Sequence, residues 1–147
     1  MDHSDFSLLA RMRISIRALN RAIEDGSASA ELTVQQQAFL LALSARGGKK
    51  VPLAAIREEL AMDQATASDL LARLVRRGYV VRAPGLDRRS ADLSMTSKGR
   101  NVLVRSVSAI RAAMRTADRA GELDALTTNM DAYLRYYGIR RRAARGR

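Results

Sequence analysis

One stretch of 28 residues decides the fold of this 147-residue chain, and it reads RLVRRGYVVRAPGLDRRSADLSMTSKGR at positions 73–100. It holds eight basic and two acidic residues, a net charge of +6 within a chain whose total is +11. Residues 140–147 add five arginines and no acidic residue, and the two signs nearly cancel elsewhere. Charge concentrated in this way is typical of a surface that binds a polyanion. A solvated surface without a partner is the alternative.

The same stretch predicts a β-hairpin that follows a helix. Gly78 suits the position just after a helix end. Tyr79-Val80-Val81-Arg82 is rich in β-branched residues, and Ala91-Asp92-Leu93-Ser94-Met95 alternates polar and apolar residues, as strands do. Pro84-Gly85 marks the loop between them. The charged segment Asp87-Arg88-Arg89-Ser90 would therefore lie at the tip of the hairpin.

The residues before the hairpin predict two short helices joined by a turn of three to four residues. Pro52 suits the first turn of one helix, whose apolar stripe includes Ile56 and Leu60. Asp63 is a suitable N-cap for the next helix, Gln64–Arg77. Two such helices fit a helix-turn-helix, and the hairpin after them would be its wing.

The helix over 64–77 divides into two faces at 100° per residue. The apolar face consists of Ala67, Leu70, Leu71, Leu74 and Val75. The opposite face begins with small polar side chains and ends in arginines. Its candidate DNA contacts are Gln64, Ala65, Thr66, Ser68, Asp69, Arg73, Arg76 and Arg77. Short side chains would let the helix enter the major groove, and the arginines would reach phosphates. An ordinary surface helix, with a basic C-terminal end that the helix dipole favours, is the alternative.

Helices are also predicted on both sides of this core. Thr33-Val34-Gln35-Gln36 fits a capping box for a helix that runs through Phe39 to Ser44. Three flanking helices have heptad-like apolar seams. The first covers 6–24 and ends at Asp25-Gly26-Ser27. The second follows a cap at Thr96 or Ser97 and runs to about Arg119, and the third covers 122–137. The seam of the first is Leu9, Met12, Ile16, Leu19 and Ile23.

Three seams from the two ends of one small chain favour a shared dimer interface over a monomeric bundle. We therefore assign residues 33–100 to a winged helix-turn-helix DNA-binding domain, and 6–24 and 101–137 to dimerisation helices. Residues 138–147 are predicted to be a disordered basic tail. A two-fold homodimer places its two recognition helices about one helical turn of DNA apart, so the expected partner is a pseudo-palindromic operator in double-stranded DNA.

The composition argues against an enzyme and against a membrane protein. There is no cysteine and the only histidine is His3, so we expect no cysteine nucleophile, no histidine or thiolate metal site and no Ser-His-Asp triad. No phosphate-binding loop or nucleophile elbow is present, and no cofactor is predicted. No apolar run approaches the roughly 20 residues that span a bilayer. The acidic N-terminus is unlike a signal peptide, so we expect a cytoplasmic protein.

In order and spacing, the run from Leu53 to Arg100 resembles the MarR family of winged helix-turn-helix regulators. The segment 33–36 also looks like the start of the family's second helix. The motifs that carry the resemblance are Leu74-Val75-Arg76-Arg77-Gly78-Tyr79-Val80, Asp87-Arg88-Arg89-Ser90 and Met95-Thr96-Ser97-Lys98-Gly99-Arg100. The resemblance implies a mainly α fold with a small β-wing, and terminal helices that interleave across a two-fold axis.

The resemblance also implies that Arg89 reaches into the minor groove from the wing tip, beside Arg88. Asp87 would hold Arg89 by a charge-assisted hydrogen bond, and a narrow A·T-rich groove attracts arginine. A local pair that only orders the loop, worth roughly 0–1 kcal/mol, is the alternative. Asp69 departs from the pattern, because a basic or neutral residue is common there. It could accept from a cytosine amine or pair with Arg73.

These features predict a dimeric, sequence-specific transcription regulator, with a repressor as the leading hypothesis. The family often releases DNA when a small aromatic or phenolic effector binds between the dimer helices and the winged domain. Phe39 and Tyr79 are the aromatic residues expected to line that cleft, and core packing is the alternative for both. The second hypothesis is a sequence-indifferent nucleic-acid-binding protein, associated with the nucleoid or RNA, which the arginine-rich tail favours.

Overall fold

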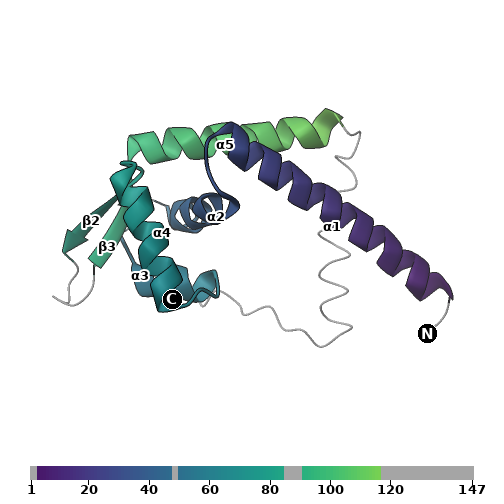
Figure 1. The fold of residues 1–147 in the computed structure, drawn as a ribbon, viewed down its shortest axis with the longest axis horizontal. Helices are drawn as coiled ribbons and strands as arrows, with labels where there is room; N and C mark the ends of the chain where they lie inside the picture. The colour runs from purple at the N-terminus through teal and green to yellow at the C-terminus, as the bar shows by residue number, and fades with distance from the viewer. Residues whose placement is uncertain (1–2, 48–49, 85–90, 117–147) are drawn as a thin grey trace. The chain divides into compact units, whose positions relative to one another are not determined.

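The structure is a computed structural model that describes residues 3–47, 50–84 and 91–116 (Figure 1). Within these ranges the elements run α1 (His3–Ser29), α2 (Val34–Ser44), β1 (Val51–Pro52), α3 (Leu53–Glu59), α4 (Gln64–Arg76), β2 (Val80–Pro84), β3 (Ala91–Met95) and α5 (Ser97–Thr116). The prediction of a mainly helical fold with a small β-wing is confirmed. The predicted helix 122–137 and the tail 138–147 lie outside the described residues.

The chain divides into two units. Among the described residues, one unit lies within 24–109, and the other comprises 3–23 and 110–116. The helix-turn-helix and the sheet belong to the first unit. None of the helices in the described ranges is long and apolar enough to cross a membrane.

Helix α2 begins at the predicted capping box. The Thr33 hydroxyl accepts a hydrogen bond from the Gln36 backbone N–H at 3.2 Å, and Gln36 Oε1 accepts from the Thr33 backbone N–H at 3.1 Å. These two bonds satisfy N–H groups that a helix start leaves without intrahelical partners. The helix ends at Ser44, as predicted, and Gly47 follows with a φ of 66°.

Helices α3 and α4 form the predicted helix-turn-helix, with residues 60–63 between them. Gly78, with a φ of 72°, follows the C-cap of α4. Its left-handed backbone lets the Gly78 and Tyr79 N–H groups donate back to the carbonyls of Val75 and Leu74, both at 2.9 Å. This is a Schellman motif, so Gly78 ends the helix where the sequence places the end.

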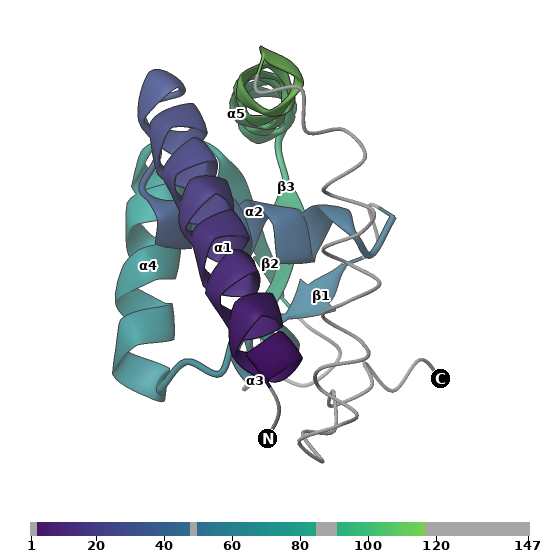
Figure 2. The same cartoon turned by 90° about the vertical axis from the view of Figure 1, so that its right-hand side faces the viewer.

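The sheet has one strand more than the sequence predicts. Its order is β1-β3-β2, all antiparallel, with Val51 opposite Leu93 and Pro52 opposite Asp92 (Figure 2). Pro52, expected in the first turn of a helix, instead lies at the N-cap of α3 with extended backbone. Proline lacks an N–H, so it fits both an edge strand and the residue before a helix. A two-residue strand is too short for an alternating pattern to reveal.

The core lies where α2, α3, α4, the sheet and the start of α5 meet. Its fully buried large side chains include Phe39, Leu40, Ile56, Leu71, Leu74, Leu93 and Val102. Burying one such side chain contributes about 1.5–3 kcal/mol. The predicted apolar face of α4 is confirmed, because Ala67, Leu70, Leu71 and Leu74 are buried and Val75 is half-buried. Burial of this face directs the opposite face of α4 to solvent.

Helix α1 is longer than predicted. The expected end at Asp25-Gly26-Ser27 is wrong, since the helix continues to Ser29. Ser27 is only 1% exposed, and Ala30 and Leu32, which follow the helix, belong to the hydrophobic core. Burying this turn outweighs the roughly 1 kcal/mol that glycine costs inside a helix. The helix terminates where Glu31 adopts a φ of 57°.

The first turn of α5 packs on the C-terminal end of α4. The Thr96 hydroxyl donates to the Gly78 carbonyl at 2.7 Å and accepts from the Gly99 N–H at 3.0 Å, while the Thr96 N–H donates to the Tyr79 carbonyl at 3.0 Å. A Cβ at Gly99 would collide with that same Tyr79 carbonyl. The threonine and glycine of the Met95–Arg100 motif thus join the wing to α4 and α5.

Candidate DNA-binding surface

The N-terminal end of α4 is fixed by Asp63. Its two carboxylate oxygens accept from the backbone N–H and from the hydroxyl of Thr66, both at 2.8 Å. The hydrogen bond from the Thr66 N–H, followed by that from the Thr66 hydroxyl, lowers the pKa of Asp63 below its usual range. The cap is therefore kept until the pH falls through this lowered pKa. Since Thr66 donates its hydroxyl proton to Asp63, it can only accept from a ligand.

The predicted DNA-binding face of α4 is directed to solvent. Gln64, Ala65, Asp69, Arg73 and Arg76 are exposed, and Thr66, Ser68 and Arg77 are half-buried. Small side chains lie at the N-terminal end of this face and arginines at the other. The order that the sequence predicts is thus retained on one continuous surface of the folded domain.

Arg77 has internal partners that the sequence does not reveal. It donates to the Glu31 carbonyl at 2.6 Å and contacts the Glu31 carboxylate at 3.5 Å. Its guanidinium lies 4.9 Å from the centre of the Tyr79 ring. These contacts join the end of α4 to the loop after α1, so Arg77 has a structural role, and its phosphate contact stays a prediction. Glu31 lies 46 positions away, too far for a local pattern to predict the pair.

Asp69 forms no ion pair with Arg73, the arginine one helical turn further along α4. Among the described residues, ion pairs join Arg46 to Glu59 and Arg77 to Glu31, and none joins Asp69 to Arg73. Arg73 is therefore available to an external anion. A carboxylate on this face repels phosphate, so Asp69 would have to face a base edge if the helix entered a groove.

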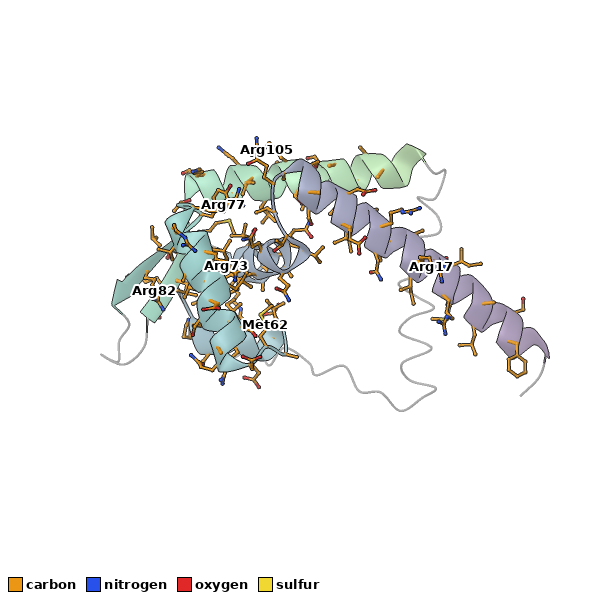
Figure 3. The ribbon with its side chains drawn as sticks, in the orientation of Figure 1. Arg17, Met62, Arg73, Arg77, Arg82 and Arg105 are labelled. Atoms are coloured by element: carbon orange, nitrogen blue, oxygen red, sulfur yellow. The ribbon has the colours of Figure 1, made fainter. Side chains whose placement is uncertain are left out.

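The wing contributes a further exposed cation. β2 and β3 pair from Val80 opposite Met95 to Pro84 opposite Ala91, which confirms the predicted hairpin. Arg82, on β2, is exposed and was not among the predicted contacts. Arg73 and Arg82 are both labelled in Figure 3, on α4 and on the adjacent hairpin. The wing-tip predictions for Asp87, Arg88 and Arg89 lie outside the described residues.

Arg57 is another side chain that the sequence pattern did not single out. It lies in the last turn of α3 and donates to Gln64 Oε1 at 3.2 Å, while Gln64 Nε2 donates to Ser68 Oγ at 3.2 Å. The two helices of the helix-turn-helix are thus linked at the start of α4. Only the turn geometry brings Arg57 to Gln64, seven residues later, so helical spacing offers no signal for it.

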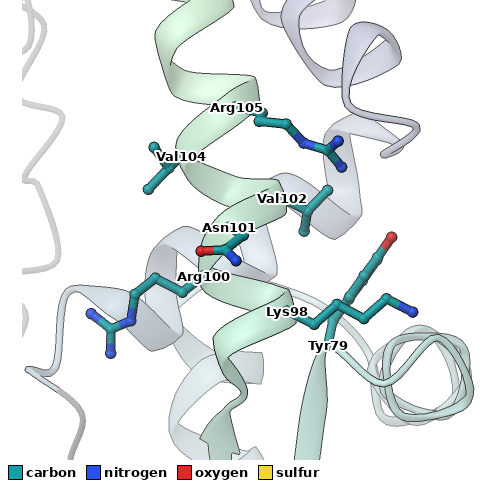
Figure 4. A pocket seen from close by; sticks show the side chains of 7 residues that line it. All are labelled: Tyr79, Lys98, Arg100, Asn101, Val102, Val104 and Arg105. Carbon is teal, nitrogen blue, oxygen red and sulfur yellow. The ribbon is translucent and has the colours of Figure 1, made fainter.

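A shallow pocket of about 650 Å³ lies where α5 begins. Its lining residues are Tyr79, Lys98, Arg100, Asn101, Val102, Val104 and Arg105 (Figure 4). Three of them are cationic and none is acidic. Lys98 extends beside the Tyr79 ring, with its ammonium 5.4 Å from the ring centre, and also donates to the Arg77 carbonyl at 2.9 Å. Tyr79 therefore lines this pocket, and its predicted role in effector binding stays a prediction, whereas Phe39 is fully buried in the core and does not line the pocket.

Comparison with known proteins relates this fold to a family. Residues 30–90, which include the helix-turn-helix and β2, match the family model described as the MarR family. The matched segment of this chain, with its helix-turn-helix, is of the MarR type. Two of the motifs on which the resemblance rests, 74–80 and 95–100, join α4, the wing and α5 in the structure. No curated protein sequence matches the chain significantly.

Solved MarR-family structures share the fold over nearly the whole chain. A MarR-family transcriptional regulator from Rhodococcus sp. RHA1 is 23% identical, with a TM-score of 0.67 over 91% of this chain and 93% of that chain. A mutant of MepR from S. aureus, bound to an oligodeoxyribonucleotide, is 22% identical, with a TM-score of 0.65 over 90% and 97%. CouR from Rhodococcus jostii RHA1, bound to p-coumaroyl-CoA, is 22% identical, with a TM-score of 0.64 over 86% of each chain. The first of these structures is described as a transcriptional regulator, and at such identities the likeness establishes the fold.

Proposed function

We propose that this protein is a dimeric, sequence-specific DNA-binding transcription regulator, and that it acts as a repressor released by a small ligand. The observation that carries the proposal is the solvent-facing side of α4. It offers small side chains around Thr66 and Ser68, then Arg73 and Arg76, which form no ion pair within the described residues. The oligonucleotide-bound MepR mutant, with the same fold, supports DNA as the partner.

The dimer part of the proposal is supported by the apolar surface of α1. Phe6 and Ile14 are 54% and 63% exposed in the single chain. The seam residues Leu9, Ile16 and Ile23 are only half-buried. An amphipathic helix of 27 residues that leaves such side chains in contact with water is typical of a subunit interface.

A selection and competition experiment tests the proposal. The full-length protein is used to select duplexes from a randomised library, and the preferred duplex is then competed with random duplex at 150 mM salt. We expect random duplex to compete at least about 10³-fold less well, as is usual for specific regulators. Equal competition would contradict the regulator and favour sequence-indifferent binding of nucleic acid.

Substitution of the wing-tip arginine is expected to weaken operator binding. Arg89→Ala should cost about 1–3 kcal/mol of specific binding free energy while the dimer stays intact, because it removes a minor-groove contact. Binding is measured by fluorescence anisotropy and the oligomer by sedimentation. Arg88→Ala, with the same charge loss one residue earlier, should instead weaken binding to all duplexes uniformly. Wild-type affinity in Arg89→Ala would contradict the wing assignment.

The effector part of the proposal places a small aromatic anion in the pocket beside Tyr79. The pocket combines an aromatic ring and two valines with Lys98, Arg100 and Arg105. We expect benzoate, used as a probe, to bind with heat release in calorimetry and to lower operator affinity. Arg105→Gln, which removes one exposed cation, should weaken benzoate binding several-fold. If benzoate binds the wild-type protein and Arg105→Gln with the same affinity, the assignment of this pocket as the effector site is wrong.

A further inference from the structure

The side-chain amide of Gln64 is held between two partners at the start of α4. Arg57 Nη1 donates to its oxygen and its nitrogen donates to Ser68 Oγ, each at 3.2 Å. Gln64 is exposed, so both contacts lie on the surface that would face DNA. It is also the only residue of α4 with a side-chain amide.

The contact with Arg57 determines which way round the amide lies. A glutamine amide can usually turn over, because its oxygen and nitrogen ends have the same shape. Guanidinium has donors and no acceptor, so only the oxygen of Gln64 can face Arg57. Ser68 can donate or accept, and therefore accommodates the nitrogen end. Arg57 is thus the partner that sets the orientation.

The held amide keeps the groups that read adenine. Its oxygen has a second lone pair after accepting from Arg57, and its nitrogen has a second N–H after donating to Ser68. Adenine presents an N6 amine donor and an N7 acceptor in the major groove, and one glutamine can contact both. An amide held in one orientation matches the donor–acceptor order of adenine. An amide that turns freely can also direct its N–H group to the acceptors of guanine, so it would distinguish adenine from guanine less well.

We infer that Arg57 is a positioning residue for base recognition: it orients Gln64 so that α4 selects adenine at one position in each half-site. The inference rests on the proposed function and adds a determinant of its specificity. Arg57 is half-buried, and one of its donors is already engaged with Gln64. Substitution of Arg57 is therefore expected to change the sequence preference of the protein, whereas loss of a phosphate contact would weaken binding to every sequence equally.

The test compares binding profiles of full-length variants on the selected operator and on duplexes with each single base pair substituted. The wild-type protein should prefer adenine roughly tenfold or more at one position per half-site. Arg57→Met should reduce that preference to about threefold or less and leave the other positions unchanged. In a Gln64→Ala background, Arg57→Met should leave the profile unchanged. Thermal unfolding followed by circular dichroism shows whether each variant is folded.

Two controls separate positioning from the other possible roles. Ser68→Ala removes only the second partner of the amide. Whatever this substitution does to overall affinity, the preference for adenine over the other bases at that position should stay close to wild type. Arg73→Met removes an exposed arginine from the same helix and should weaken all duplexes by the same factor. If Arg57→Met behaves like Arg73→Met, or if no position prefers adenine, the inference is wrong while the regulator proposal stands. If the wild-type protein selects no site at all, the proposed function fails, and the inference fails with it.

Discussion

Raising the salt concentration from 50 to 200 mM is expected to weaken operator binding by the intact protein about 10³- to 10⁵-fold. This range holds if the bound dimer neutralises roughly 6–10 phosphates, because each neutralised phosphate releases counterions and adds about −0.9 to the slope of log affinity against log salt. Residues 73–100 carry a net charge of +6, and Arg73, Arg76 and Arg82 are exposed. Fluorescence anisotropy of a labelled operator across this salt range measures the slope.

Substitutions that each remove one positive charge show which residues contribute to the salt dependence of operator binding. Arg73→Gln and Arg76→Gln should each make the slope less steep by about two, because each substitution removes one phosphate contact from both subunits of the dimer. Arg17→Gln removes the same charge from an exposed position on α1 and should leave the slope unchanged. A chain that lacks residues 140–147 should lose affinity for all duplexes and have a flatter slope. A slope equally sensitive to Arg17 and to Arg73 would contradict α4 as the DNA-binding element.

Gly99→Ala is expected to destabilise the winged domain by about 3 kcal/mol. Gly99 is buried in the first turn of α5, and a Cβ there would collide with the Tyr79 carbonyl and lie 3.0 Å from Met95 Cγ. Overpacking of this kind typically costs about 1–3 kcal/mol, and here one of the obstructing atoms is backbone. Urea unfolding followed by circular dichroism gives the change in free energy of unfolding.

The sign of the change in free energy of unfolding is informative, because the higher helix propensity of alanine would by itself stabilise α5. Alanine at an unobstructed helix position is about 1 kcal/mol more favourable than glycine. Gly47→Ala is the matched control: its Cβ would meet nothing within 4 Å, but its φ of 66° is left-handed. We expect Gly47→Ala to cost about 1 kcal/mol from backbone strain alone. A Gly99→Ala protein as stable as wild type, or more stable, would show that α5 does not approach Tyr79 closely.

Much of the domain could be predicted because its signals are local. Thr33 and Gln36 form a capping box within four residues, Asp63 caps α4, and Gly78 ends it with a left-handed backbone. The two faces of α4 follow from helical periodicity alone. Each of these features depends on residues fewer than about ten positions apart, which is the range that pattern reasoning covers.

The features that could not be predicted depend on tertiary packing. The pairing of β1 with β3 joins residues 51–52 to 92–93, and two residues show no alternation. The contact of Arg77 with Glu31 arises only when the loop after α1 meets the end of α4. Helix α1 continues past Gly26 because the next turn is buried, and burial outweighs the local signal to stop.

Hydroxyl-radical footprinting of the full-length protein on its selected operator tests the central claim most directly. If two copies of α4 enter the major groove from a two-fold dimer, two equal half-sites should be protected, with centres about 10–10.5 base pairs apart or a multiple of that. Substituting either half-site should weaken protection of both. Protection of one half-site alone, or uniform protection along the whole duplex, would contradict a dimeric regulator that reads sequence through α4.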